Sequence, residues 1–144
     1  SNEGSSDEGS SLETRVQGLR QGMEISRLLH VMPKPTLAII PGPAAGAGLS
    51  LALACDMRFC LDTAKITTAF SKIGASGDYG GSYFLPQLVG AAKARELYFS
   101  AEVITGQEAY DMGMMTKVAG AETFEEESRA YAKHLAGLDR KSVV

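Results

Sequence analysis

Apolar side chains recur at steps of three and four residues through the first part of the chain. Because such steps return to one face of an α-helix, we expect an amphipathic helix over residues 12–31. Pro33 and Pro35 end it, since proline lacks the backbone N–H that a helix needs. The positions that carry this period are Leu12, Val16, Leu19, Met23, Ile25, Leu28, Leu29 and Met32.

The two ends of the chain show no such period. Residues 1–11 contain only Ser, Gly, Glu, Asp and Asn, so burial of apolar surface cannot offset the entropy lost on ordering. We predict a disordered polar tail over residues 1–11, a folded domain over residues 12–138, and a short tail over residues 139–144.

A short apolar run, a glycine-alanine junction and a helix made of small residues follow the first helix. Residues 36–40 are apolar and branched, which favours a buried strand. Residues 41–48 read Pro-Gly-Pro-Ala-Ala-Gly-Ala-Gly. From Gly48 to Met57 nearly every side chain is small or apolar, so this second helix should be buried on most sides. Its first-turn N–H groups have no partner within the helix, which makes the junction a candidate anion or oxyanion site.

The rest of the chain alternates between extended and helical patterns. Residues 59–61 and 65–68 predict two short strands joined by a turn, and residues 114–118 predict another extended segment. Two helices are expected from about Ser82 to Pro86 and over residues 91–101. A capping box at Thr105–Glu108 predicts the start of a third, and a second capping signature at Thr123 predicts a last helix that runs to about Leu138. Helices alternating with short buried strands predict an α/β fold.

Composition narrows the functional classes. The chain has 144 residues, 44% of them hydrophobic and 22% charged, and a formal net charge of −3, which gives no support for a nucleic-acid surface. No apolar run reaches the roughly 20 residues that a bilayer span needs, and we expect a cytoplasmic protein without membrane contact. Cys55 and Cys60 lack metal-ligand spacing and are interpreted as buried small hydrophobes, and we expect no metal site.

The order of several motifs resembles the enoyl-CoA hydratase/isomerase (crotonase) superfamily. The resemblance covers about residues 12–138, the family's central and C-terminal core. It is carried by the segments Lys34–Ile40, Gly42–Gly48, Leu51–Asp56, Gly80–Ser82, Leu85–Gly90, Ala92–Leu97, Thr105–Ala109 and Gly113–Met115.

The resemblance implies a partial crotonase-like spiral of ββα units and a coenzyme A thioester as substrate, with no covalently bound cofactor. In the family, two backbone N–H groups hold the thioester oxygen as it becomes an enolate, and the second of these falls on Ala47. Preorganised donors of this kind stabilise charge that develops in the transition state. Alanine in place of the usual glycine still supplies the N–H.

The family's hydratases carry glutamates at two positions that are Ser50 and Phe70 here. Neither can act as a carboxylate acid or base, so a standard hydratase mechanism is poorly supported. Asp78 matches a position where isomerase-like members carry an aspartate, and an aspartate near it attacks the substrate in dehalogenase-like members. Asp78 is therefore either a general acid/base for double-bond migration or a helix N-cap in a glycine-rich turn.

The remaining site assignments concern substrate binding. Tyr79, with Tyr83 and Phe84, either lines an acyl pocket or belongs to the core. His30 and His134 receive no catalytic role. The residues that the resemblance places along the acyl-CoA are Ala45, Gly46, Gly48, Ser50, Ala69, Phe70, Gly74 and Tyr79.

Family members also carry an N-terminal half that supplies the first oxyanion donor, and nothing before Leu12 matches it. Apolar faces made for that half predict a homo-oligomer, a trimer or hexamer, or a complementing chain that carries it. Two functions follow: an acyl-CoA-binding isomerase/hydratase-family enzyme with isomerisation favoured, or a catalytically inactive truncated paralogue or fragment that acts as a binding or assembly module.

Overall fold

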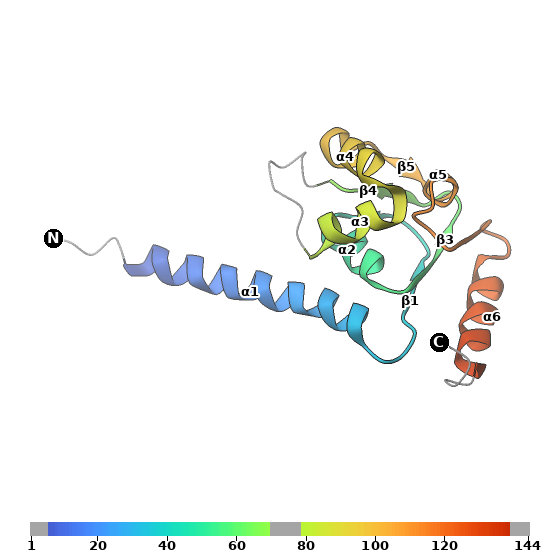
Figure 1. Cartoon of the computed structure of the whole chain (residues 1–144), viewed down its shortest axis with the longest axis horizontal. Coiled ribbons are helices and arrows are strands. Elements are labelled where there is room, and N and C mark those ends of the chain that lie inside the picture. Colours follow the sequence, from blue (N-terminus) through green and yellow to red (C-terminus); the bar gives the residue numbers. More distant parts are fainter. Residues whose placement is uncertain (1–5, 70–78, 139–144) are drawn as a thin grey trace.

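The computed structural model describes residues 6–69 and 79–138 and shows two small sheets covered by helices, with one long helix leading away from them (Figure 1). The α/β class predicted from the alternating pattern is confirmed. Of the predicted tails, residues 1–5 and 139–144 lie outside the described residues.

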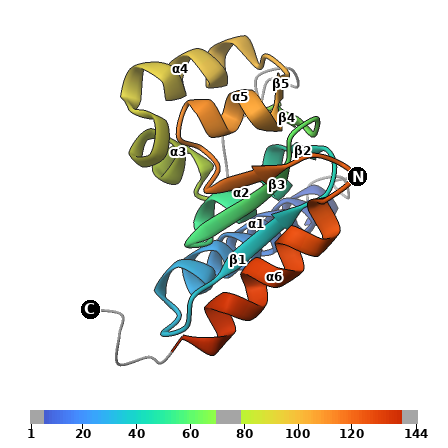
Figure 2. The same ribbon diagram turned by 90° about the vertical axis from the view of Figure 1, so that its right-hand side faces the viewer.

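The first sheet is parallel, in the order β1-β3-β6, and is formed by Leu37–Ile40, Met57–Leu61 and Lys117–Ala119. β1 pairs with β3 from Leu37 opposite Met57 to Ile40 opposite Cys60. Helix α6 (Phe124–Gly137) packs on one face of this sheet, where the Phe59 and Phe124 rings meet edge to face at 5.7 Å. Helix α2 (Gly46–Ala54) lies on the other face (Figure 2).

The second sheet has the order β2-β4-β5 and consists of Ala44–Ala45, Lys65–Thr67 and Ile104–Thr105. β2 runs parallel to β4, and β5 antiparallel to it. The two strands predicted on either side of the Asp62 turn, β3 and β4, therefore belong to different sheets. The two-residue strands β2 and β5 were not predicted, because so short a segment shows no alternation of apolar and polar positions.

The central helix α2 (Gly46–Ala54) is the core element that the sequence predicted, although it ends three residues earlier than expected. Leu49, Leu53 and Ala54 are buried, and α2 packs against α3 (Gly81–Val89) and α1 (Ser6–Val31). Helices α4 (Ala91–Ser100) and α5 (Gly106–Asp111) complete the cover of the second sheet.

The long helix α1 (Ser6–Val31) begins six residues before the predicted start, so residues 6–11 are helical rather than the disordered tail expected for them. Adding residues to an existing helix costs far less than starting one, which explains this extension into a polar segment. Only its C-terminal part packs on the body, where Ser26 is buried and the His30 ring lies 5.0 Å from that of Phe84. Figure 1 shows the remainder of α1 leading away.

The two predicted capping boxes have different outcomes. At α5, the Thr105 side chain accepts from the Glu108 N–H at 3.1 Å and the Glu108 carboxylate accepts from the Thr105 N–H at 2.7 Å, which confirms the box. At α6, Thr123 makes no side-chain cap. Its backbone is already helical (φ −113°, ψ −8°), whereas an N-cap side chain reaches back to the first turn from an extended backbone.

Candidate functional site

The glycine-alanine junction connects β1 to α2 through β2. Ala45, at the N-cap of α2, has an extended backbone (φ −140°, ψ 154°) and no side-chain cap, and Gly46 enters the helix with a φ of +50°. This left-handed conformation suits glycine, which has no Cβ to clash. The junction therefore turns the chain sharply and leaves the first-turn N–H groups of α2 without a side-chain acceptor from the N-cap.

Open space lies in front of that turn. Gly48 is exposed, and a Cβ added to it would meet no atom within 4 Å, while Ala47 is half-buried. The first turn of α2 contains no acidic side chain, so the positive end of the helix dipole is not neutralised there. Of the predicted substrate contacts, the structure thus brings Ala45, Gly46 and Gly48 together with Ala47 at one helix end.

The opposite end of α2 is closed by Arg58, which is 4% exposed. Its guanidinium donates to the Cys55 carbonyl at 2.6 Å and to the Met114 carbonyl at 2.8 Å, with a longer bond to the Leu53 carbonyl at 3.4 Å. Burial lowers the pKa of Arg58, and the Leu53 and Cys55 carbonyls that it contacts lie at the helix end, where carbonyls lack partners within the helix. The sequence pattern alone gave Arg58 no such role.

A second clamp ties β1 to the end of α2. The Asp56 carboxylate accepts from the Thr36 N–H at 2.8 Å and from the Thr36 hydroxyl at 3.0 Å, and the Asp56 N–H donates to that hydroxyl at 2.9 Å. These bonds join residues twenty positions apart. They fix the start of β1, and through it the path of the chain into the junction.

Ser50 is buried at 2% exposure and faces α3 rather than the junction. A Cβ on Gly81, the first residue of α3, would overlap the Ser50 hydroxyl and lie 2.6 Å from the Tyr98 hydroxyl. Glycine at position 81 therefore allows α2 and α3 to approach closely. Ser50, which the family resemblance matches to a hydratase glutamate, is part of this contact.

Ala69 and Tyr79, the residues on either side of residues 70–78, both have a left-handed backbone conformation. Ala69 has a φ of +58° and Tyr79 a φ of +51°, which is uncommon for residues other than glycine and occurs preferentially near functional sites. The Tyr79 ring packs on Gly22 of α1, where a Cβ would overlap it. Tyr79 thus anchors the entry to α3 against α1. The predicted site residues Phe70, Gly74 and Asp78 lie outside the described residues.

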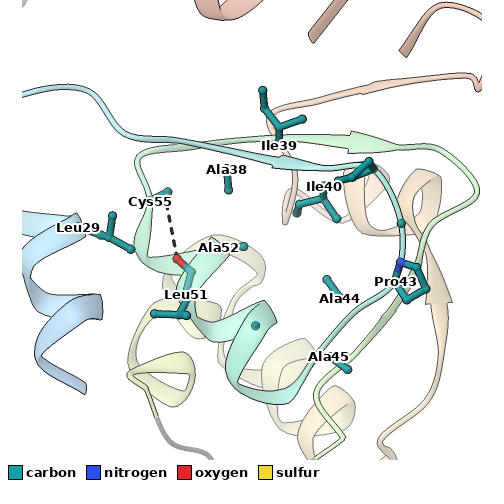
Figure 3. A pocket seen from close by; sticks show the side chains of 13 residues that line it. Leu29, Ala38, Ile39, Ile40, Pro43, Ala44, Ala45, Leu51, Ala52 and Cys55 are labelled. Carbon is teal, nitrogen blue, oxygen red and sulfur yellow. Dashed lines mark hydrogen bonds between the residues drawn. The ribbon is translucent and has the colours of Figure 1, made fainter. Parts of the chain in front are cut away.

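A pocket of about 580 Å³ lies beside the junction, and Ala45 and Gly48 form part of its wall (Figure 3). β1, the junction, β2 and α2 contribute to it, with Leu29 from α1. Its walls are formed by Leu29, Ala38, Ile39, Ile40, Pro41, Gly42, Pro43, Ala44, Ala45, Gly48, Leu51, Ala52 and Cys55. The lining is apolar apart from backbone groups and the Cys55 thiol.

The two cysteines are free thiols. Cys60 is fully buried, and burial raises its pKa to about 11. Cys55 is half-buried at the pocket wall, and burial raises its pKa too. Both shifts disfavour the thiolate, the nucleophilic form, as expected of small core residues. Among residues 6–69 and 79–138, no group of three potential metal ligands is found.

A sequence model of the family described as "Enoyl-CoA hydratase/isomerase" matches residues 10–144. The chain belongs to this family. The resemblance of its motif order to the crotonase superfamily is therefore confirmed.

Individual relatives place this family membership in context. The chain is 36% identical over 112 residues to 4-chlorobenzoyl coenzyme A dehalogenase-1 of Arthrobacter sp, covering 78% of this chain and 41% of that protein. It is 40% identical over 130 residues to the probable enoyl-CoA hydratase of Rhodobacter capsulatus, covering 90% and 49%. The chain thus spans less than half the length of these relatives.

Solved structures of the family share the fold. The chain superposes on a putative enoyl-CoA hydratase from Thermobifida fusca, crystallised in complex with acetoacetyl-CoA, with a TM-score of 0.81 and 28% identity. The match covers 88% of this chain and 49% of that one. No helix among the described residues of this family member is long and apolar enough to cross a membrane.

Proposed function

We propose that this member of the enoyl-CoA hydratase/isomerase family binds an acyl-CoA thioester and favours migration of its double bond over hydration. The observation that carries the proposal is the first turn of α2, where Ala47 and Gly48 lie at an uncapped helix end facing open space. Such an end stabilises a negative oxygen through oriented N–H groups. We assign the Ala47 N–H to the thioester oxygen.

The position of Ser50 supports isomerisation. Hydration requires one group that activates water and another that delivers a proton. Ser50 offers no carboxylate and is buried against α3, so it adds no acid or base at the mouth of the junction. This leaves Asp78, in the segment between Ala69 and Tyr79, as the acid/base that we assign.

The proposed reaction needs only one such group. The Asp78 carboxylate removes a proton from the carbon next to the thioester of a 3-enoyl-CoA. The C–H electrons form a new double bond while the thioester oxygen takes up negative charge, which the Ala47 N–H stabilises. When that charge returns, the γ-carbon takes the proton from Asp78 and a 2-enoyl-CoA results, with no net change in atoms or electrons.

One donor is half of the site that the family resemblance implies, and the 144 residues span about half of the relatives' length. We therefore infer that the second donor comes from outside these residues: from copies of this chain in a trimer or hexamer, from a complementing chain, or from further residues of the same polypeptide. A cytoplasmic location also stays a prediction from the sequence.

A panel of 3-enoyl- and dienoyl-CoA thioesters tests the assignment. We expect turnover to be lost in Asp78→Asn and kept in Asp111→Asn, a matched change at an exposed aspartate on α5. The comparison is made in an assembled protein whose wild type turns over at least one thioester, and equal turnover of the two variants there would remove Asp78 from the mechanism.

The competing function is a catalytically silent assembly module. Calorimetric titration with CoA and with acetoacetyl-CoA separates the two. An acyl-CoA-binding protein releases or absorbs heat with either ligand, whereas a silent module that only assembles gives none while still migrating as an oligomer.

A further inference from the structure

The N-terminus of α3 is another helix end without a side-chain cap. Gly80, its N-cap, has a φ of +78°, and the first turn of α3 contains no acidic residue. The Tyr83 and Phe84 N–H groups donate to the Gly80 carbonyl at 2.9 and 3.0 Å. Those of Gly81 and Ser82 come earlier in the turn and find no acceptor among the described residues. Both N–H groups therefore remain available at the positive end of this helix.

The Ser50 hydroxyl of α2 points at this turn. Its oxygen overlaps the position that a Cβ on Gly81 would occupy, whereas the Ser50 Cβ lies 3.3 Å from that position. Because the Cα–Cβ bonds of a helix tilt toward its N-terminus, the hydroxyl lies on the N-terminal side of Gly81. The side chain is 2% exposed, and its hydroxyl finds no hydrogen-bond partner among residues 6–69 and 79–138. A buried hydroxyl without a partner costs free energy, which a hydrogen bond to a ligand oxygen offsets.

The space beside this hydroxyl is closed on the inner side and open on the outer side. Gly81 is buried, and the Tyr98 hydroxyl of α4 lies 2.6 Å from the same Cβ position, whereas Ser82 is exposed. A ligand group that enters past Ser82 meets the Gly81 and Ser82 N–H groups and the Ser50 hydroxyl. Several donors at the positive end of a helix suit a small anion such as a carboxylate.

The spacing along α2 relates Ser50 to the proposed oxyanion donor. Ser50 follows Ala47 by three positions, and helix residues three apart are neighbours on one face, with Cβ atoms roughly 5–6 Å apart. An acyl group whose thioester oxygen lies at Ala47 therefore reaches Ser50 within a few bonds. Two carbons between the thioester carbonyl and a carboxylate, at roughly 1.5 Å per bond, let the oxygens of the two groups span this distance.

We propose that the first turn of α3 and the Ser50 hydroxyl form a carboxylate-binding subsite, and that the acyl group of the substrate ends in a carboxylate separated from the thioester carbonyl by two carbons. This rests on the proposed binding of the thioester at Ala47. The carboxylate accepts from the Ser50 hydroxyl and from the Gly81 and Ser82 N–H groups. A thioester without the carboxylate leaves these donors without an acceptor, so the subsite selects against it.

Calorimetric titration of the assembled protein with three four-carbon thioesters tests the subsite. We expect succinyl-CoA, which carries the carboxylate, to bind about tenfold or more tightly than butyryl-CoA, as one hydrogen bond to a charged group implies. Acetoacetyl-CoA, whose second oxygen is a neutral carbonyl one carbon nearer the thioester, should bind like butyryl-CoA. Because none of the three acyl groups has a carbon–carbon double bond to move, affinity is measured without turnover.

Two variants remove the donors one at a time. Ser50→Ala removes the hydroxyl, and Ser82→Pro removes an N–H in the first turn of α3, where proline is tolerated. Each should reduce the preference for succinyl-CoA by roughly tenfold and leave the affinity for butyryl-CoA unchanged. Ser128→Ala, at a serine 3% exposed on α6, and Ala92→Pro, in the first turn of α4, are the matched controls and should keep the preference.

Circular dichroism first establishes that each variant is folded, and Ser50→Ala decides the test if Ser82→Pro is not. Equal wild-type affinity for succinyl- and butyryl-CoA would overturn the subsite and leave acyl-CoA binding in place, as would a preference that both variants retain. A preference for acetoacetyl-CoA over succinyl-CoA would overturn the assignment of a carboxylate. Binding of none of the three thioesters would overturn the proposed function together with the subsite.

Discussion

The two ends of helix α2 are treated in opposite ways. At the C-terminal end, the buried Arg58 donates to the carbonyls of Cys55 and Leu53, and the helix dipole meets a positive charge. At the N-terminal end, Ala45 provides no side-chain acceptor and Gly48 faces open space. Backbone groups at one end are used for stability, and we propose that those at the other bind a ligand.

The largest effect is expected at the closed end. Arg58→Met keeps the apolar stem but removes the bonds to the Cys55 and Met114 carbonyls, and loss of two charge-assisted bonds should lower the free energy of unfolding by about 3–5 kcal/mol. Urea unfolding measures it. Arg95→Met, at an exposed arginine on α4, is the control and should change stability little. An equally small loss at Arg58 would show that water replaces the guanidinium.

The next largest effect is expected on catalysis at the open end. Ala47→Pro removes one N–H, and loss of a single oxyanion donor typically lowers kcat by about 10²–10³-fold. Stability should change little, because proline is tolerated in the first turn, where that N–H has no partner within the helix. Ala92→Pro makes the same change in the first turn of α4 and should leave kcat unaltered. Similar kinetics in both variants would exclude the Ala47 donor.

The difference between the two ends also shows what the sequence could reveal. The apolar composition of residues 48–57 predicted a buried helix with an open N-terminus, because both follow from local chemistry. The role of Arg58 could not be predicted in the same way, since its bond to Met114 spans 56 positions. The Thr36–Asp56 clamp and the two-residue strands likewise depend on tertiary placement. The pocket between β1, the junction and α2 could not be predicted either, because its shape depends on the path of β1, which no local pattern encodes.

A smaller effect follows from closing the open end deliberately. Ala45 has the extended backbone of an N-cap, so Ala45→Ser would let a hydroxyl accept from the N–H of Ala47 or Gly48 and raise the free energy of unfolding by about 1 kcal/mol. The same hydroxyl competes for the thioester oxygen, and acyl-CoA affinity should fall. Thermal unfolding and calorimetry measure the two changes. A variant that gains stability and keeps full affinity would place the thioester elsewhere.

The smallest effect concerns α5, whose N-terminus is satisfied by its own side chains. The Thr105 N–H, followed by its hydroxyl, lowers the pKa of Glu108. Because the folded-state pKa lies below the unfolded value of about 4.3, the carboxylate stabilises the fold fully above that value and less as pH falls through the folded pKa. The stability difference between the wild-type chain and Glu108→Gln should therefore be constant from about pH 6 to 8 and shrink below about pH 4.

Urea titrations across this range measure this difference. Glu122→Gln, at an exposed glutamate before α6, is the matched control. A pH-independent difference would mean that the hydrogen bonds alone, without the charge, hold this end. The N-terminus of α5 is capped by its own Thr105 and Glu108 side chains, so no ligand is expected there. Acyl-CoA affinity should therefore be unchanged in Glu108→Gln, whereas it should fall in Ala45→Ser at α2.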